Sequence, residues 1–221
     1  MIRTAIFTYL LTLTTLASTA STGNDADLQN LKQQASESAV VFVGDSRTVG
    51  MKKTVYKSID KDNEFFIAES GQGYSWLKST GIPNLKTTIS SHGNISDWTI
   101  VTNLGVNDLE DADKYVDTYK KLMDDMTSQG RSVTMYVVSV NPIDESKCKS
   151  VTNAEIDSTN KIFETSFADY SNIRYIDSNT YVKSILATTD GLHYTDGTYK
   201  SIYTYILKTI SGWENSINII V

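Results

Sequence analysis

The sequence predicts one α/β domain in which helices cover both faces of a parallel sheet. Short apolar runs rich in Val and Ile recur along the 221 residues, and helix-like stretches separate them. Such runs are typical of strands that are buried on both faces. Alternation of strand and helix indicates βαβ units, whose strands pair in parallel. The sequence shows neither an internal repeat nor a second domain.

The domain is expected to span 38–221, and the apolar runs place its elements. Five runs predict strands at 39–43, 65–68, 98–104, 133–140 and 173–176. The stretches between and after them predict helices over 111–129, 153–170 and 195–210. The segment 21–37 is polar and lacks a strong apolar period, so we expect it to precede the domain as a tether or as a weak first helix.

Residues 1–20 have the features of a secretory signal peptide. Arg3 supplies a positive start, a mostly apolar stretch covers 5–16, and small residues permit cleavage after Ala20. The stretch is too short for a comfortable transmembrane helix, so no stable membrane insertion is expected after cleavage. A buried N-terminal helix is the alternative. We expect a secreted, extracellular protein of bacterial origin.

Composition and charge exclude some partners. The formal net charge is −6 and the sequence pI is about 4.9. An acidic surface without a basic stripe disfavours binding to nucleic acid and to anionic membranes. Cys148 is the single cysteine, so the chain cannot form an intramolecular disulfide and its core has to hold the fold.

Ligand sites of parallel α/β sheets lie beyond the carboxyl ends of the strands, so the residues after each strand are the candidates. Gly44-Asp45-Ser46-Arg47 follows the first expected strand. A serine at such a turn presents its Oγ beside the N–H groups that begin a helix, and these donors can stabilise an oxyanion. The alternative is that Asp45 or Ser46 only caps the helix.

Two further strands also end in candidate residues. Gly71 and Gly73 follow the second strand, where a glycine can offer its N–H to a ligand or simply form a turn. Tyr74 and Trp76 come next, and they either line a substrate groove or pack into the core. Asn107 follows the third strand, and its amide either donates to a developing negative charge or starts an Asx turn.

Asp190 and His193 lie three residues apart, ahead of the last expected helix. A histidine that reaches the serine can act as general base, and a carboxylate on its other nitrogen holds the required tautomer. The alternative is a capping aspartate beside a histidine satisfied in the core. The only other histidine, His92, lies where a helix is expected to end, which leaves His193 as the base.

Taken in order, these four blocks resemble the SGNH hydrolases, also called the GDSL-type esterases and lipases. That family has a GDS block, a glycine block, a GxND block and a DxxH block, and the resemblance runs from about Val41 to His193. It implies a three-layer α/β/α sandwich of flavodoxin-like kind, with a mainly parallel central sheet. It also implies ester hydrolysis through an acyl-enzyme.

The resemblance assigns a role to each block. Ser46 becomes the nucleophile, His193 the base and Asp190 the residue that orients it. Ser46, Gly71 and Asn107 become the oxyanion hole, with Gly73 as the alternative to Gly71. Arg47 replaces the leucine of the family name, and we expect it to place a positive charge near the site that favours a polar or anionic substrate.

Other catalytic signatures are absent from the sequence. It has no G-x-S-x-G elbow, no H-E-x-x-H motif, no Cys/His cluster and no P-loop. We therefore expect neither a metal nor a cofactor.

The expected activity is that of a serine hydrolase acting on carboxylic esters (EC 3.1.1 type), with O-acetyl groups of polysaccharide or peptidoglycan as substrate. Export and a site rimmed by Tyr74, Trp76 and Tyr194 motivate this expectation, and Arg47 and Gly73 are further expected substrate contacts. Glycan O-acetyl transfer, a lipase or short-chain carboxylesterase activity, and catalytically silent glycan binding are the alternatives. The oligomeric state stays open.

Overall fold

The computed structural model describes residues 38–55 and 63–217. The expected signal peptide, 1–20, and the polar segment 21–37 lie outside the described residues. Within them, no helix is both long enough and apolar enough to cross a membrane.

The centre of the fold is a sheet of five parallel strands in the order β2-β1-β3-β4-β5. In chain order the strands are β1 (Ser38–Gly44), β2 (Glu64–Ala68), β3 (Asp97–Asn103), β4 (Ser132–Val138) and β5 (Ile173–Ile176). Gly44 at the end of β1 pairs with Ala68 of β2 and Asn103 of β3, so three strands end side by side. The segments after these strands therefore meet at one edge of the sheet.

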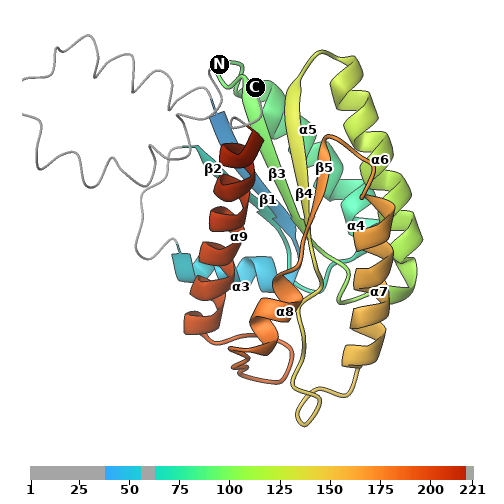
Figure 1. Ribbon diagram of the computed structural model, residues 1–221, viewed down its shortest axis with the longest axis vertical. Coiled ribbons are helices and arrows are strands. Elements are labelled where there is room, and N and C mark those ends of the chain that lie inside the picture. Colours follow the sequence, from blue (N-terminus) through green and yellow to red (C-terminus); the bar gives the residue numbers. More distant parts are fainter. Residues whose placement is uncertain (1–37, 56–62, 218–221) are drawn as a thin grey trace, which may run out of the picture.

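Helices cover both faces of this sheet (Figure 1). One face carries α3 (Ser46–Val55), α8 (Ser178–Lys183) and α9 (Asp196–Ile217). The other carries α4 (Tyr74–Trp76), a π-helical turn (Leu77–Gly81), α5 (Ile82–Ser91), α6 (Ala112–Ser128) and α7 (Asn153–Ser166), with a 3₁₀ turn (Leu109–Asp111) before α6. The expected three-layer α/β/α sandwich is confirmed.

Two hydrophobic clusters fill the space between the sheet and the helical layers. Along β1, Val41 and Val43 face the α5–α7 side, whereas Val40 and Phe42 face α3 and α9. This alternation is the two-residue period of a strand buried on both faces. Burying one such side chain stabilises the fold by about 1.5–3 kcal/mol.

The strands fall within one or two residues of their expected bounds, and so does α6. Helices α7 and α9 begin where expected, but α7 ends at Ser166 and not at 170, and α9 continues to Ile217 and not only to 210. The start of the helical run 74–91 and helix α8 were not predicted, and α3 was predicted only as a helix that begins near Ser46. The run is hard to recognise because a π turn interrupts its period and Pro83, which has no N–H, lies at the start of α5. Helix α8 has six residues, too few for a periodic pattern.

Candidate active site

Ser46 lies at a tight turn between β1 and α3. A Cβ added to Gly44 would stand 1.9 Å from Thr48 Oγ1 and 2.7 Å from the carbonyl oxygen of Asn103, so only glycine fits there. Asp45 caps the helix, because its Oδ1 accepts a hydrogen bond from the Arg47 N–H at 2.9 Å. With the cap supplied by Asp45, the Ser46 hydroxyl is available for another partner.

That partner is His193. Ser46 Oγ lies 2.9 Å from His193 Nε2, and His193 Nδ1 lies 2.7 Å from Asp190 Oδ2. The three side chains thus form one hydrogen-bonded chain, although 147 positions separate the serine from the histidine. The side chains of His193 and Asp190 are 36% and 55% exposed, so the chain lies at an open surface.

Asp190 also shapes the loop that carries His193. Its Oδ1 accepts hydrogen bonds from the backbone N–H groups of Leu192, at 2.9 Å, and His193, at 2.7 Å. Desolvation raises the pKa of Asp190, but these N–H donors and the His193 ring outweigh it and lower that pKa to about 2. This stabilising contribution is therefore present above the ordinary value of 3.8 and is lost as the pH falls towards 2.

The ionisation of Asp190 decides the tautomer of His193. A carboxylate can only accept hydrogen bonds, so Nδ1 has to carry the proton that lies between the two side chains. The neutral ring then presents the lone pair of Nε2 to the Ser46 hydroxyl. This is the arrangement in which a histidine takes a proton from a serine nucleophile.

The two glycines after β2 have different surroundings. Gly71 has a φ of +74°, and a Cβ there would meet nothing within 4 Å. A Cβ at Gly73 would stand 2.2 Å from Asp108 Oδ2. Gly73 therefore makes room for a carboxylate of the neighbouring loop, whereas the space beside Gly71 is open to a ligand. Between the two, the surroundings favour Gly71 for the oxyanion hole.

Asn107 and Asp108 bind the glycine segment to the loop after β3. Asn107 Nδ2 donates to the Gln72 carbonyl oxygen at 2.7 Å, and its second hydrogen can serve a substrate. Asp108 accepts hydrogen bonds from the Tyr74 N–H at 2.5 Å and from the Tyr115 hydroxyl at 2.8 Å. Asp108 is a supporting residue that the sequence analysis did not assign, although it is part of the GxND block.

Three of the expected substrate contacts lie in the interior. Trp76 is 7% exposed and donates to Glu69 Oε2, and Tyr194 is 3% exposed and donates to the Pro142 carbonyl oxygen. Arg47 is 3% exposed, so its charge does not face a substrate, contrary to the expectation from sequence. Tyr74, another expected contact, is half-buried, and its hydroxyl is hydrogen-bonded to the Thr118 hydroxyl.

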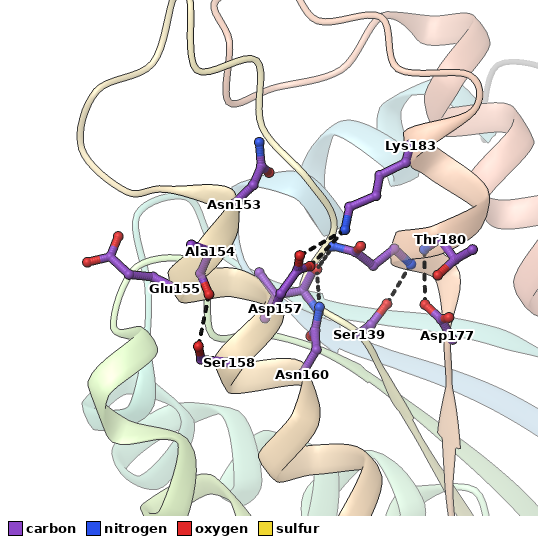
Figure 2. A network of polar contacts seen from close by, with 12 residues as sticks. Ser139, Asn153, Ala154, Glu155, Asp157, Ser158, Asn160, Asp177, Thr180 and Lys183 are labelled. Carbon is purple, nitrogen blue, oxygen red and sulfur yellow. Dashed lines mark hydrogen bonds and ion pairs between the residues drawn. The ribbon is translucent and has the colours of Figure 1, made fainter.

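A second set of polar residues holds the chain where it leaves β4 (Figure 2). Asn160 of α7 makes two hydrogen bonds with the backbone of Val140, at 2.7 and 2.9 Å, and Ser139 Oγ accepts the N–H of Asn179. Lys183 of α8 pairs with Asp157 of α7 at 2.8 Å. These contacts fix the start of the segment that connects β4 to α7, and this segment lies against the His193 loop, where the Asp144 N–H donates to the Gly191 carbonyl oxygen.

His92 lies away from this constellation. It ends α5, and its Nδ1 lies 2.8 Å from the Thr88 carbonyl oxygen, while its ring packs near Phe65 and Trp98. Within 38–55 and 63–217, no three His, Cys, Asp or Glu side chains gather as a metal site would require.

Asp45 supplies a testable electrostatic property of the site. The side chain is 2% exposed, and burial raises its pKa to about 6 even though the Arg47 charge opposes the rise. Because the pKa of Asp45 is higher in the folded than in the unfolded chain, the protonated side chain favours folding. This contribution to the free energy of unfolding is fully present below pH 3.8 and is lost as the pH rises through about 6. One pKa unit corresponds to about 1.4 kcal/mol, so ionisation costs about 3 kcal/mol.

Asp45→Asn keeps an acceptor for the Arg47 N–H and cannot ionise. We measure the free energy of unfolding in urea and subtract the wild-type value from that of Asp45→Asn. We expect this difference to rise by up to about 3 kcal/mol between pH 4 and pH 7. A difference that stays constant over this range would show that Asp45 does not titrate there.

Comparison with known proteins identifies the fold. The sequence matches no protein-family model and no curated protein sequence. A solved structure from Streptococcus pneumoniae, described as a candidate platelet activating factor, is 16% identical, with a TM-score of 0.62 over 86% of this chain and 100% of that chain. The acetyl xylan esterase AlAXEase is 17% identical, with a TM-score of 0.56 over 78% and 99%.

A third solved structure is the C-terminal catalytic domain of peptidoglycan O-acetyltransferase A from Streptococcus pneumoniae. It is 17% identical, with a TM-score of 0.53 over 79% of this chain and 91% of that chain. Likeness at these identities shows a shared architecture. The chain has the α/β/α fold of the SGNH hydrolases, as the order of its four blocks predicts.

Proposed function

We propose that this protein is a serine esterase of the SGNH hydrolase family. The observation that carries the proposal is the continuous hydrogen-bonded chain from Ser46 through His193 to Asp190. Ser46 Oγ attacks the ester carbonyl carbon while His193 Nε2 takes the hydroxyl proton, and that proton then passes to the departing alcohol. Water, deprotonated by the same nitrogen, releases the acid from the acyl-enzyme.

The oxyanion of each tetrahedral intermediate needs donors that are already in place. The Ser46 N–H at the start of α3, the Gly71 N–H and the second hydrogen of Asn107 Nδ2 are the proposed set. Asn107 and Asp108 bind Gln72 and Tyr74, and these bonds hold the segment that carries Gly71 against the loop after β3. Removing one such donor typically slows acyl transfer by about 10²–10³-fold.

The proposed substrate class is O-acetyl esters of carbohydrates outside the cell. Two solved structures with this fold are described as an acetyl xylan esterase and a peptidoglycan O-acetyltransferase. The exposure of His193 and Asp190 suits an ester that projects from a polymer, and residues 1–20 support export. The aromatic rim expected from sequence does not support this choice, because Trp76 and Tyr194 are buried.

Hydrolysis of p-nitrophenyl acetate, butyrate and octanoate tests the proposed acyl preference. We expect turnover to be fastest with acetate, together with release of acetate from acetylated xylan or O-acetylated peptidoglycan. Preference for octanoate would instead indicate a lipase. Ester turnover without release from either polymer would contradict the carbohydrate assignment.

Acetyl transfer to a glycan hydroxyl is the second candidate. The likeness to the peptidoglycan O-acetyltransferase domain favours it, and the same acyl-enzyme serves both reactions because only the acceptor differs. Adding a saccharide acceptor to the acetate assay separates the two. Acetylated saccharide in place of free acetate would identify a transferase.

A further inference from the structure

Arg47 is a buried cation immediately after the candidate nucleophile. It is the second residue of α3 and is 3% exposed. Its Nη1 donates to the Asn141 carbonyl oxygen at 2.7 Å, and its Nε donates to the Leu192 carbonyl oxygen at 3.1 Å. The guanidinium also lies 5.0 Å from the centre of the Tyr194 ring, within the range of a cation–π interaction.

These contacts join three segments that are far apart in the sequence. The nucleophile turn carries Arg47, the segment 141–151 lies within the connection from β4 to α7, and the loop 190–194 carries Asp190 and His193. The last two segments are also bound directly to each other. Asp144 N–H donates to the Gly191 carbonyl oxygen at 2.9 Å, and the Tyr194 hydroxyl donates to the Pro142 carbonyl oxygen at 2.7 Å.

Packing alone gives little reason for a charge at this position. Burial removes the hydration of the guanidinium, which is unfavourable. Its charge interacts with the buried Asp45 carboxyl, but its hydrogen bonds go to neutral carbonyl groups, and its Nη2 has no hydrogen-bond partner among the described residues. A leucine or methionine would fill much of the same volume without that penalty. What the guanidinium adds is a rigid fork, whose donors can reach two carbonyl groups at once.

We propose that Arg47 is a positioning residue, which holds the His193 loop in register with Ser46 by bridging the Leu192 and Asn141 carbonyl groups. The inference rests on the proposed function, since it assigns Arg47 a role in the Ser46–His193 reaction. Among the described residues, Arg47 directs its side-chain hydrogen bonds to the Leu192 and Asn141 carbonyl groups and its cation–π contact to the Tyr194 ring, and not to the side chains of Ser46 or His193. It acts through the backbone of the residue before His193, so it sets the contact between His193 Nε2 and Ser46 Oγ.

The test compares Arg47→Met, which keeps the apolar stem, with Arg47→Lys, which keeps the charge without the fork. We expect Arg47→Met to lower kcat about 100-fold, because displacing a catalytic group by about 1 Å has effects of this size. KM should change less than about threefold, since Arg47 does not face the substrate. A lysine cannot bridge both carbonyl groups, so kcat of Arg47→Lys should stay within about tenfold of Arg47→Met.

A core variant separates positioning from loss of stability. Ile206 in α9 is fully buried in the hydrophobic cluster on the α3 side of the sheet, and Ile206→Ala also lowers the melting temperature. At a temperature where both variants are folded, Ile206→Ala should keep the wild-type kcat while Arg47→Met does not. An equal loss of kcat in the two variants would overturn the inference.

A spectroscopic readout follows His193 without any substrate. The chain has two histidines, so a His92→Gln background with ¹⁵N-labelled histidine leaves one imidazole to observe. We expect Arg47→Met to shift or broaden the His193 ring signals, and Ile206→Ala to leave them unchanged. Unchanged signals in Arg47→Met would overturn the inference.

The inference and the proposed function can fail separately. Activity that survives in Ser46→Ala would remove the proposed function, whatever Arg47 does, and the ring signals would still report whether Arg47 positions His193. An inactive Ser46→Ala beside a fully active Arg47→Met would remove only the inference. Full recovery in Arg47→Lys would show that the charge, and not the bridge between the two carbonyl groups, matters.

Discussion

Ser46→Ala is expected to lower kcat for p-nitrophenyl acetate by about 10⁶-fold, the size of the loss when the serine nucleophile of a serine protease is removed. The variant loses the atom that forms the acyl-enzyme, and no other group can take its place beside His193 Nε2. The fold should persist, because Asp45 and not Ser46 caps α3.

The matched control is Ser75→Ala, which removes an exposed serine in α4 after a neighbouring strand. Its kcat should equal that of the wild type. A fluorophosphonate, which labels activated serines, should modify the wild type and Ser75→Ala but not Ser46→Ala. Labelling that persists in Ser46→Ala, or is lost in Ser75→Ala, would identify a different nucleophile.

Asp190→Asn is expected to lower kcat by about 10⁴-fold, close to the effect of the equivalent change in other serine hydrolases. An asparagine oxygen can still accept the N–H groups of Leu192 and His193, so the loop keeps its turn. Its amide N–H₂ then faces His193 Nδ1 and favours the tautomer with the proton on Nε2. That tautomer cannot accept the proton of Ser46.

Two measurements test this explanation. The melting temperature should fall less in Asp190→Asn than in Asp190→Ala, because the asparagine loses only the charge whereas the alanine leaves both backbone donors without an acceptor. The ¹⁵N signals of the His193 ring should report the changed tautomer in Asp190→Asn. A variant that keeps the wild-type tautomer and still loses activity would show that Asp190 has another role.

The sequence by itself determined the architecture and the catalytic candidates. Runs such as 39–43 are apolar on both faces, and only a parallel sheet covered on two sides buries them. Because parallel strands end at a common edge, Ser46 and Asn107 could be placed near each other from their positions after two strands. Asp190 and His193 could be paired because they share one short loop.

Only the tertiary structure decided the surroundings of these residues. From the sequence, Arg47 is expected to be a charge near the surface of the site. In the structure the segment 141–151, which has no helix or strand, covers it, and the Asn141 carbonyl oxygen accepts one of its hydrogen bonds. Gly73 could be distinguished from Gly71 only once Asp108, from another loop, was found against it. Tyr194 is buried for a similar reason, since its hydroxyl donates to the carbonyl oxygen of Pro142, which is 52 positions away, whereas the partner of buried Trp76 is the nearby Glu69. The local sequence predicts where a helix or strand lies and where it ends. The contacts of a side chain also depend on residues from other parts of the chain, which only the packing of the fold brings next to it.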